Sequence, residues 1–427
     1  MKIIESSKIK EKAYIEILEN GMKVIIIPKP NLNKKYIIWG THFGSIDNRF
    51  IMPNTKEEVF IPDGVAHFLE HKMFEQKNGT NSLDTLMALG LDANAYTTND
   101  HTAYLFECTN NFYEGLDELM DYVQNPYFTD ENVEKEKGII GQEIKMYDDE
   151  PSWRLYMNAM DCMYKENPIK IDIAGSIDSI SKITPDVLYK CYNTFYNPSN
   201  MIMVVCGDFN PEELLKQIKN RLVKKEEQGE IKRIYPSKEN EINKKYKEQK
   251  MEISLPIFAI GYKDIEGMTE DIVKKHIAIE ILLNMIIGKS SEIYKELYEK
   301  GILSALPDID YEFSHEYAHI LISGQSKNPD IIKEKINDKV EEYIKNGLNE
   351  EHFNRIRKKV YGDYVVEYNS VGDIARMFLA DSMKEINSFD YIEKFNEVTK
   401  EYTETVLKNV FKSENMIMSV IKCKDAE

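Results

Sequence analysis

Long apolar runs are missing from this sequence of 427 residues. No stretch approaches the roughly 18 consecutive apolar residues that a membrane-spanning helix needs, so we expect no membrane segment. The N-terminus, MKIIESSKIKEKAYIEIL, has no uninterrupted hydrophobic region of the kind that a secretory signal contains. We therefore predict a cytoplasmic protein.

Basic residues are in the minority. The chain has 55 lysines and arginines against 73 aspartates and glutamates, which gives a formal net charge of −18. Proteins that bind nucleic acid need a basic face to displace counterions, so this balance argues against a nucleic-acid partner. Long-range steering by the negative charge mildly favours basic or neutral substrates.

Cysteine is also scarce, and its five copies show no paired spacing. An odd number of scattered cysteines predicts reduced, packed thiols rather than a disulfide framework or a cysteine-based zinc site. The hydrophobic share of 42% is sufficient for substantial cores. A chain of this length is expected to contain two or more domains.

The sequence contains an internal repeat. Residues 183–203 and 398–418 align without a gap, and each segment has the pattern of a helix followed by a strand that opens with Asn-Met-Ile-Met. A weaker similarity relates the residues from Phe128 to those from Leu348. Two amphipathic segments can look alike by chance, but the common order and an offset near half the chain favour an internal duplication.

The duplication divides the chain into two homologous halves, residues 1–222 and 251–427. Between them lies a charge-rich segment, residues 223–250, that is nearly free of large aliphatic side chains and is expected to be a solvated linker.

Hydrophobic periodicity predicts an α+β fold. Strands are expected at 13–18, 23–28, 36–43, 93–98, 102–108 and 252–262. Helices are expected at 65–74, 82–89, 113–123, 131–147, 153–164, 271–287 and 331–345. Because strands and helices are grouped rather than strictly alternating, they predict layered halves and not a doubly wound sheet.

Two of only eight histidines stand in one short motif, His67-Phe-Leu-Glu70-His71. Residues four apart share one face of a helix, so both imidazoles can reach one ion. Glu70 lies on the same side and can contact the attacking water without being a ligand, which is the inverted form of the His-Glu-x-x-His arrangement. The pattern occurs by chance in on the order of one or two per hundred such chains, where it would be two ordinary histidines beside a solvated glutamate.

A catalytic zinc ion normally takes three protein ligands, so a third donor is required. The helical segment from Val133 carries two candidates, Glu136 and Glu143, which are two turns apart and share a face. An exposed acidic stripe would have the same pattern. Spacing alone does not choose between the two glutamates.

The motif with a glutamate pair about 70 residues further on resembles the pitrilysin/insulinase (mitochondrial processing peptidase-like) family of zinc metallopeptidases. The resemblance implies two homologous halves, each a mainly antiparallel sheet with helices on one face, in the LuxS/processing-peptidase-like metallohydrolase fold. It implies Zn²⁺ as the cofactor, Glu143 as the third ligand after His67 and His71, and Glu136 as the carboxylate that orients a ligand histidine.

The run that begins Asn94-Ala95-Tyr96 resembles the edge strand to which the family adds its peptide substrate by main-chain hydrogen bonds. More narrowly, a bacterial YmfH-like branch is indicated by PDGVAHFLEH, TAYLFE, VEKEKGIIGQEIKMYDD, KIDIAG and FYNPSNM. Members of that branch are often associated with modification of translation elongation factor P.

The sequence departs from the family pattern in its second half. Active single-chain members carry there an Arg and a Tyr, seven residues apart, that stabilise the tetrahedral intermediate. Here Tyr298 stands at the Arg position and Ala305, or Ser304 in a shifted register, at the Tyr position. His276 is followed by Ile279 and Glu280, so the second half lacks a metal motif of its own.

Family members with this pattern pair with a paralogous subunit that lacks the metal but supplies Arg and Tyr. We therefore expect the metal-bearing subunit of such a heterodimer, a zinc endopeptidase in which Glu70 transfers the proton. Alternative hypotheses are a non-proteolytic structural or assembly subunit and an accessory protein for elongation factor P modification.

Overall fold

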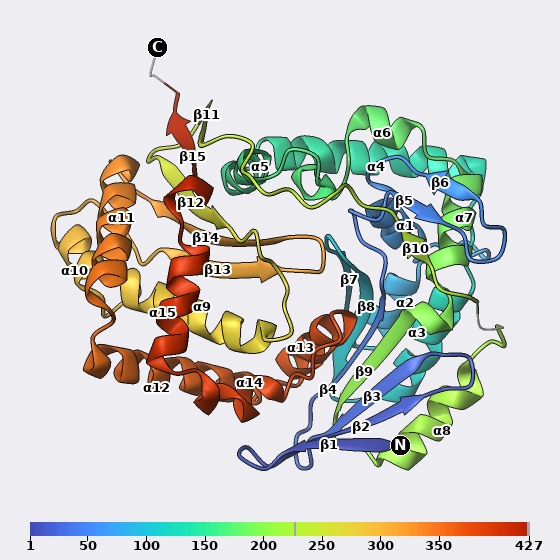
Figure 1. Cartoon of the computed structure of the whole chain (residues 1–427). Helices are drawn as coiled ribbons and strands as arrows, with labels where there is room; N and C mark the ends of the chain where they lie inside the picture. Colours follow the sequence, from blue (N-terminus) through green and yellow to red (C-terminus); the bar gives the residue numbers. More distant parts are fainter. Residues whose placement is uncertain (226–227, 425–427) are drawn as a thin grey trace. The chain divides into compact units, whose positions relative to one another are not determined.

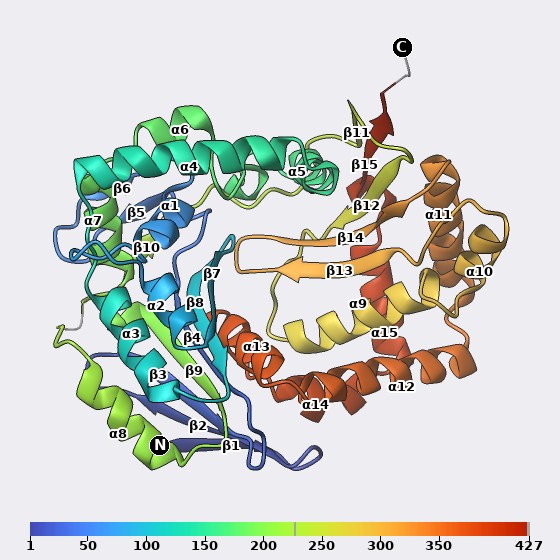
Figure 2. The ribbon, with the colours of Figure 1, turned by 180° about the vertical axis from the view of Figure 1, so that it is seen from behind.

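The computed structural model describes residues 1–225 and 228–424, and the chain forms two compact units (Figures 1 and 2). The first unit comprises Met1–Ile144, Ile171–Tyr235 and Val365–Phe389. The second unit comprises Lys145–Lys170, Pro236–Tyr364 and Asp390–Glu427. Each unit is built around one large sheet.

The sheet of the first unit has seven strands in the order β1-β2-β3-β9-β4-β8-β7. Its strands are β1 (Lys2–Ser6), β2 (Glu11–Ile17), β3 (Lys23–Pro28), β4 (Lys35–Thr41), β7 (Asp92–Thr97), β8 (Thr102–Cys108) and β9 (Met201–Gly207). A smaller sheet has the order β10-β5-β6, from β5 (Arg49–Ile51), β6 (Glu58–Phe60) and β10 (Lys232–Arg233). In the large sheet the pairing of β3 with β9 is parallel, and the other pairings are antiparallel.

The sheet of the second unit has five strands in the order β11-β15-β12-β14-β13. They are β11 (Tyr246–Met251), β12 (Ile257–Lys263), β13 (Asp308–Phe313), β14 (Ala318–Gln325) and β15 (Met416–Cys423). The strand predicted to start at residue 252 begins only at Ile257, because the preceding Pro256 has no N–H to donate to a neighbouring strand.

The two sheets repeat one another. The pairs β11–β15, β15–β12, β12–β14 and β14–β13 have the same order and directions as β3–β9, β9–β4, β4–β8 and β8–β7, including the parallel first pair. The repeated Asn-Met-Ile-Met segments are the starts of β9 and β15, and each strand follows a helix, α7 (Pro185–Phe195) or α15 (Lys400–Val410). The duplication and the predicted α+β class are confirmed.

The helices of the first unit are α1 (Val65–Lys72), α2 (Ser82–Ala88), α3 (Phe112–Gln124), α4 (Asp130–Asp148), α6 (Ile177–Ser181), α7, α8 (Pro211–Arg221) and α13 (Val371–Met383). Those of the second unit are α5 (Pro151–Met163), α9 (Ile272–Ile286), α10 (Glu292–Glu299), α11 (Pro329–Asn346), α12 (Glu350–Glu367), α14 (Asp390–Glu393) and α15. Each helix expected from periodicity is present, with ends shifted by about two residues. None of the helices within the described residues has the length and apolarity needed to cross a membrane.

The core of the first unit lies between the helices and one face of its sheet. Ile37 and Trp39 of β4 belong to this core, together with the residues of α3 at helical spacing, Phe112, Leu116, Leu119, Met120 and Val123. Since side chains alternate across a strand, Ile38 and Gly40 point to the opposite face. That face is covered by α13, which packs on β4 and β9.

Helices therefore cover both faces of this sheet, and not one face as the resemblance implied. In the second unit the corresponding helix is α5, which packs on β12 and β15. Each unit thus contains a helix from the other half of the sequence. The boundaries at 222 and 250 describe the duplicated halves of the sequence and remain a prediction. The compact units differ from these halves, because the segment with α5 belongs to the second unit and the segment with α13 to the first.

A glycine marks each place where an exchanged helix meets the sheet. Gly40 pairs with Ile202 and Gly261 with Ile417, and these isoleucines are equivalent in the repeat. A Cβ on Gly40 would lie 2.9 Å from Cδ1 of Leu379, and a Cβ on Gly261 would overlap Cε of Met163. Because these positions have no side chain, the helix can lie close to the strand.

The segment 223–250, of which residues 226 and 227 lie outside the described residues, is otherwise more structured than a solvated linker. It contains β10 and β11, and Glu239 accepts hydrogen bonds of 2.7–2.8 Å from the backbone N–H groups of Lys165, Glu166 and Asn167. These bonds and Lys263 lower the pKa of Glu239 to about 2 although burial opposes its charge. Strand β11 lies at a sheet edge, and its side chains alternate between exposed and half-buried. Its charged residues therefore gave no hydrophobic pattern from which a strand could be predicted.

We predict that Gly261→Ala destabilises the second unit by about 1–3 kcal/mol, because the added methyl group overfills the contact with Met163 and approaches the carbonyl oxygen of Ile320 within 3.0 Å. Gly324→Ala, on the neighbouring strand β14, is the matched control. Its Cβ would meet Phe258 at an ordinary 3.4 Å, so its effect should stay within about 0.5 kcal/mol. Urea denaturation midpoints measure both, and equal midpoints would refute the packing argument.

Candidate metal centre

Helix α1 begins at a backbone contact that only glycine permits. Gly64, which precedes the helix, has φ of +91°, and a Cβ there would collide with the carbonyl group of Ala174. Gly175, with φ of +75°, packs in return against the backbone of Asp63. The end of the sequence KIDIAG, Ala174 and Gly175, therefore packs against the start of the helix that carries His67-x-x-Glu70-His71 and fixes its position.

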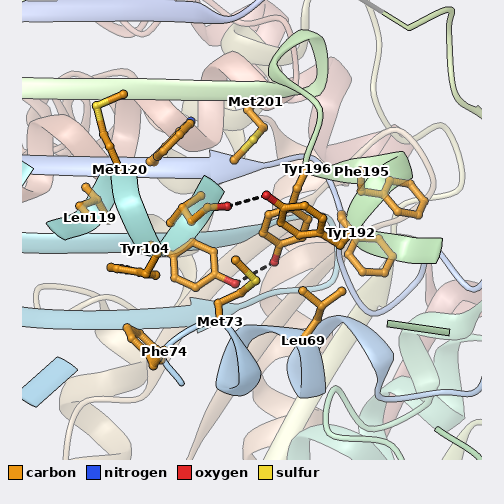
Figure 3. Packing of buried hydrophobic residues seen from close by; sticks show 14 of the residues in the cluster. Leu69, Met73, Phe74, Tyr104, Leu119, Met120, Tyr192, Phe195, Tyr196 and Met201 are labelled. Atoms are coloured by element: carbon orange, nitrogen blue, oxygen red, sulfur yellow. Dashed lines mark hydrogen bonds between the residues drawn. The ribbon is translucent and has the colours of Figure 1, made fainter. Parts of the chain in front are cut away.

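One side of α1 is anchored in the core. Phe68 and Leu69 are fully buried, and Met73 follows them directly after the helix. Figure 3 shows Leu69 and Met73 among buried aromatic residues that include Tyr104 and Tyr196, whose hydroxyl groups are joined by a hydrogen bond of 2.8 Å. This packing fixes the rotation of α1 and turns His67, Glu70 and His71 away from the core.

Glu143 of α4 meets both histidines. Its Oε1 lies 3.6 Å from Nε2 of His67, and its Oε2 lies 3.5 Å from Nε2 of His71. The three residues each offer one ligand atom within 4.8 Å of the others. Two ligands of one tetrahedral zinc ion at 2.0–2.1 Å lie ~3.3 Å apart, so this arrangement fits zinc. Two imidazoles and a carboxylate are also an ordinary catalytic donor set.

Glu136, one of the two candidates that spacing left open, contacts His71 from the other side. Its Oε1 accepts a hydrogen bond of 3.1 Å from Nδ1 of His71, which leaves Nε2 directed toward Glu143. Its Oε2 lies 3.4 Å from Nζ of Lys72, a lysine with only 1% of its side chain exposed that also pairs with Glu75. Glu136 therefore has the position of a carboxylate that orients a ligand histidine.

Charges around His71 outweigh its burial. Burial disfavours the imidazolium ion, but the hydrogen bond to Glu136 and the charges of Glu70, Glu143 and Glu136 raise the pKa of His71 above its ordinary value. Burial likewise disfavours ionised Glu136, but His71 and Lys72 lower the pKa of Glu136. A metal ion binds a histidine nitrogen that carries no proton, so metal binding at Nε2 of His71 would compete with protonation of the ring.

His67 is held by packing rather than by a second carboxylate. Its Nδ1 is buried and has no hydrogen-bond partner among the described residues. Its ring centroid lies 4.5 Å from that of His71. The two imidazoles therefore differ: Nδ1 of His71 bonds Glu136, whereas Nδ1 of His67 has no such partner among the described residues.

Glu70 lies beside the ligands but outside the group of three. Its side chain is 7% exposed, and its Oε2 accepts a hydrogen bond of 2.7 Å from the hydroxyl of Thr97 on β7. A carboxylate so placed can exchange a proton with a molecule held at the metal ligands. The sequence motif predicts Glu70 here, whereas Thr97 was not predicted.

Strand β7 forms one edge of the seven-stranded sheet, with β8 as its neighbour among the described strands. Asn94, Ala95 and Tyr96 lie on this edge strand, as expected, and the backbone N–H of Ala95 donates to Oδ1 of Asn94 at 2.9 Å. The hydroxyl of Tyr96 lies 3.4 Å from Nε2 of His101. The role of these three residues in substrate binding remains a prediction.

The residues that depart from the family pattern belong to the second unit. Tyr298 is on α10 with 53% of its surface exposed, and Ala305 follows in the segment before β13. His276 of α9 is half-buried, and its Nδ1 lies 2.9 Å from the hydroxyl of Tyr391. His276 is therefore a packed histidine.

Comparison with known proteins identifies the family. Residues 61–176 match the family description insulinase (peptidase family M16), and residues 182–360 match the peptidase M16 inactive domain. A Bacillus subtilis protein named uncharacterized zinc protease YmfH is 39% identical over 414 residues, which are 96% of both chains. The chain belongs to the insulinase (M16) peptidase family.

Two solved structures share the fold of this chain. An M16-like peptidase from Alicyclobacillus acidocaldarius is 32% identical, with a TM-score of 0.93 and coverage of 99% of this chain and 100% of that one. A protease from Helicobacter pylori is 20% identical, with a TM-score of 0.81 over 96% of this chain and 100% of that one, which shows a shared fold. The metal motif lies within the matched insulinase segment.

We predict graded losses of zinc affinity around this centre. Glu143→Gln should weaken zinc binding by at least about 100-fold, because it removes a charged ligand, and Glu136→Gln by about 10- to 100-fold, because it removes the group that orients His71. Glu134→Gln is the matched control on α4, where Glu134 forms an exposed ion pair with Lys137. Competition with a chromophoric chelator measures all three, and an unchanged affinity of the Glu143 variant would contradict the assigned ligand set.

Proposed function

We propose that the protein is a zinc-dependent endopeptidase that hydrolyses peptide bonds. The observation that carries the proposal is the convergence of His67, His71 and Glu143 within 4.8 Å, with Glu70 held next to them by Thr97. Membership of the M16 family and similarity to a protein named as a zinc protease support it. A structural role alone would give no reason for the carboxylate of Glu70.

His67, His71 and Glu143 would hold the zinc ion, which when bound supplies a Lewis acid for the scissile carbonyl group and the attacking water. Glu70 accepts a proton from the attacking water and returns it to the leaving amine. Glu136 keeps Nδ1 of His71 protonated and so directs Nε2 toward the ion. Lys72 balances the charge of Glu136 in a buried position.

The substrate is proposed to bind as an extended peptide along β7. An edge strand offers unpaired backbone groups to which a peptide can add by main-chain hydrogen bonds. Asn94, Ala95 and Tyr96 stand on this strand immediately before Thr97, which contacts Glu70. A peptide that pairs with β7 is thereby placed in register with the group that transfers the proton.

A second subunit is part of the proposal. Tyr298 and Ala305 replace the Arg and Tyr that the family resemblance implies, so this chain lacks that pair of groups for the oxyanion. One such donor commonly contributes about 10²- to 10³-fold to the rate. We therefore propose a heterodimer with a paralogous subunit that supplies both residues. The cytoplasm is the proposed location, since each of the five cysteines is a free thiol.

We predict that Glu70→Gln retains zinc but lowers peptide hydrolysis by about 10²- to 10⁴-fold, because it removes the proton acceptor and keeps the shape of the side chain. Cleavage of a peptide library is measured for both proteins, alone and with the co-purified partner, and zinc content by elemental analysis. Wild-type cleavage should increase with the partner. Unaltered cleavage by the variant would show that Glu70 is not the base.

The second candidate is a non-proteolytic assembly subunit, and the exposed Tyr298 in place of Arg favours it. In that case neither protein would cleave peptides with any partner, and Glu70→Gln would leave complex assembly unchanged. An accessory role in elongation factor P modification is distinguished by deleting the protein from cells and weighing that factor by mass spectrometry.

A further inference from the structure

Thr97 connects the acidic group of the centre to the sheet. Glu70 is at the end of α1, whereas Thr97 is the last residue of β7, and α1 packs directly on this strand. The hydroxyl of Thr97 donates to Oε2 of Glu70 at 2.7 Å. Glu70 is therefore restrained from outside its own helix.

The donor lies next to a second threonine. Thr97 stands directly opposite Thr102 of β8, and their hydroxyl oxygens are 3.3 Å apart. Thr102 is fully buried, and its hydroxyl donates to the backbone carbonyl of Phe43 at 2.9 Å. Both threonines are β-branched, so their side chains have restricted rotamers in a strand.

The hydrogens can be assigned from this geometry. The single proton of the Thr102 hydroxyl is used on the carbonyl of Phe43, so Thr102 does not compete for Glu70. In the 2.7 Å contact the hydroxyl of Thr97 is the donor and Oε2 of Glu70 is the acceptor. Thr97 is thus a donor with one defined target, Oε2 of Glu70.

We propose that Thr97 is a positioning residue, which fixes the carboxylate of Glu70 beside the metal ligands and couples it to the strand that receives the peptide. This inference rests on the proposed endopeptidase function. Its physical basis is that one oxygen of Glu70 is tied to Thr97, which leaves the other oxygen for the proton transfer. A misplacement of about 1 Å at such a site can reduce a rate by about 10²-fold.

The coupling has a kinetic signature. Asn94, Ala95 and Tyr96 carry the proposed peptide contacts, and these do not depend on the hydroxyl of the next residue. Loss of that hydroxyl should therefore lower kcat and leave KM nearly unchanged, because the peptide still pairs with β7 while Glu70 is no longer aligned. A general loss of folded protein would instead reduce the zinc content along with the rate.

The test compares Thr97→Val with Thr97→Ser in the full chain with its partner. Valine keeps the β-branched shape without the hydroxyl, and serine keeps the hydroxyl. Thr97→Val should lower kcat by about 10- to 100-fold with KM within about twofold and an unchanged zinc content, and Thr97→Ser should retain most of the activity. Thr85→Val is the matched control, since the Thr85 hydroxyl bonds only locally within the start of α2, to the carbonyl of Asn81.

A double variant shows whether the effect passes through Glu70. If it does, Thr97→Val has no further effect on the residual rate of Glu70→Gln, because the residue that it positions is already inactive. Additive losses in the double variant would overturn the proposal, since they would place the action of Thr97 elsewhere.

An infrared measurement separates failure of this inference from failure of the proposed function. The difference spectrum between wild type and Glu70→Gln isolates the carboxylate band of Glu70. This band should shift in Thr97→Val and not in Thr97→Ser, whether or not the protein cleaves peptides. An unshifted band would refute the role of Thr97. So would full activity of Thr97→Val, if the wild-type protein cleaves peptides. An inactive wild type with a shifted band would refute only the endopeptidase.

Discussion

The contact between α1 and α4 is the constraint on which the candidate centre depends. Glu143 is directed at Nε2 of both His67 and His71, at 3.6 Å and 3.5 Å, and Glu136 on the preceding turns of the same helix bonds Nδ1 of His71. Two glutamates spaced by two helical turns can therefore contact both ring nitrogens of one imidazole. Neither helix alone contains a complete site, and the buried residues around each of them set the distances.

The second unit has the same strand order as the first but lacks the metal motif on the corresponding helix. Helix α9 packs on β13 as α1 packs on β7. At the spacing of the metal motif it carries His276, Ile279 and Glu280, and the ring of His276 packs against Tyr311, Phe313 and Tyr391. Where α1 has ligands, α9 has a histidine enclosed by aromatic rings. The duplicated fold thus keeps its strand order while the chemistry of its two halves has diverged.

In each unit, the helix that comes from the other half of the sequence packs on the sheet at a glycine. Each sheet has a glycine at the equivalent position of its central strand, and a methionine at the end of the exchanged helix, Met383 or Met163, lies against it. The repeat in the sequence revealed the duplication through β9 and β15 with their preceding helices. It did not reveal the exchange, because α5 and α13 share length and packing but no recognisable sequence pattern.

The sequence by itself determined the helix with His67, Glu70 and His71, a strand through Asn94–Tyr96 and the candidate pair Glu136 and Glu143, because these follow from local periodicity and motif spacing. Its resemblance to a family assigned Glu143 as the ligand. Tertiary structure alone decided that Glu143 faces both imidazoles, that Lys72 balances Glu136 and that Thr97 holds Glu70. These are contacts between residues distant in sequence, and their geometry is fixed by packing that no local pattern encodes.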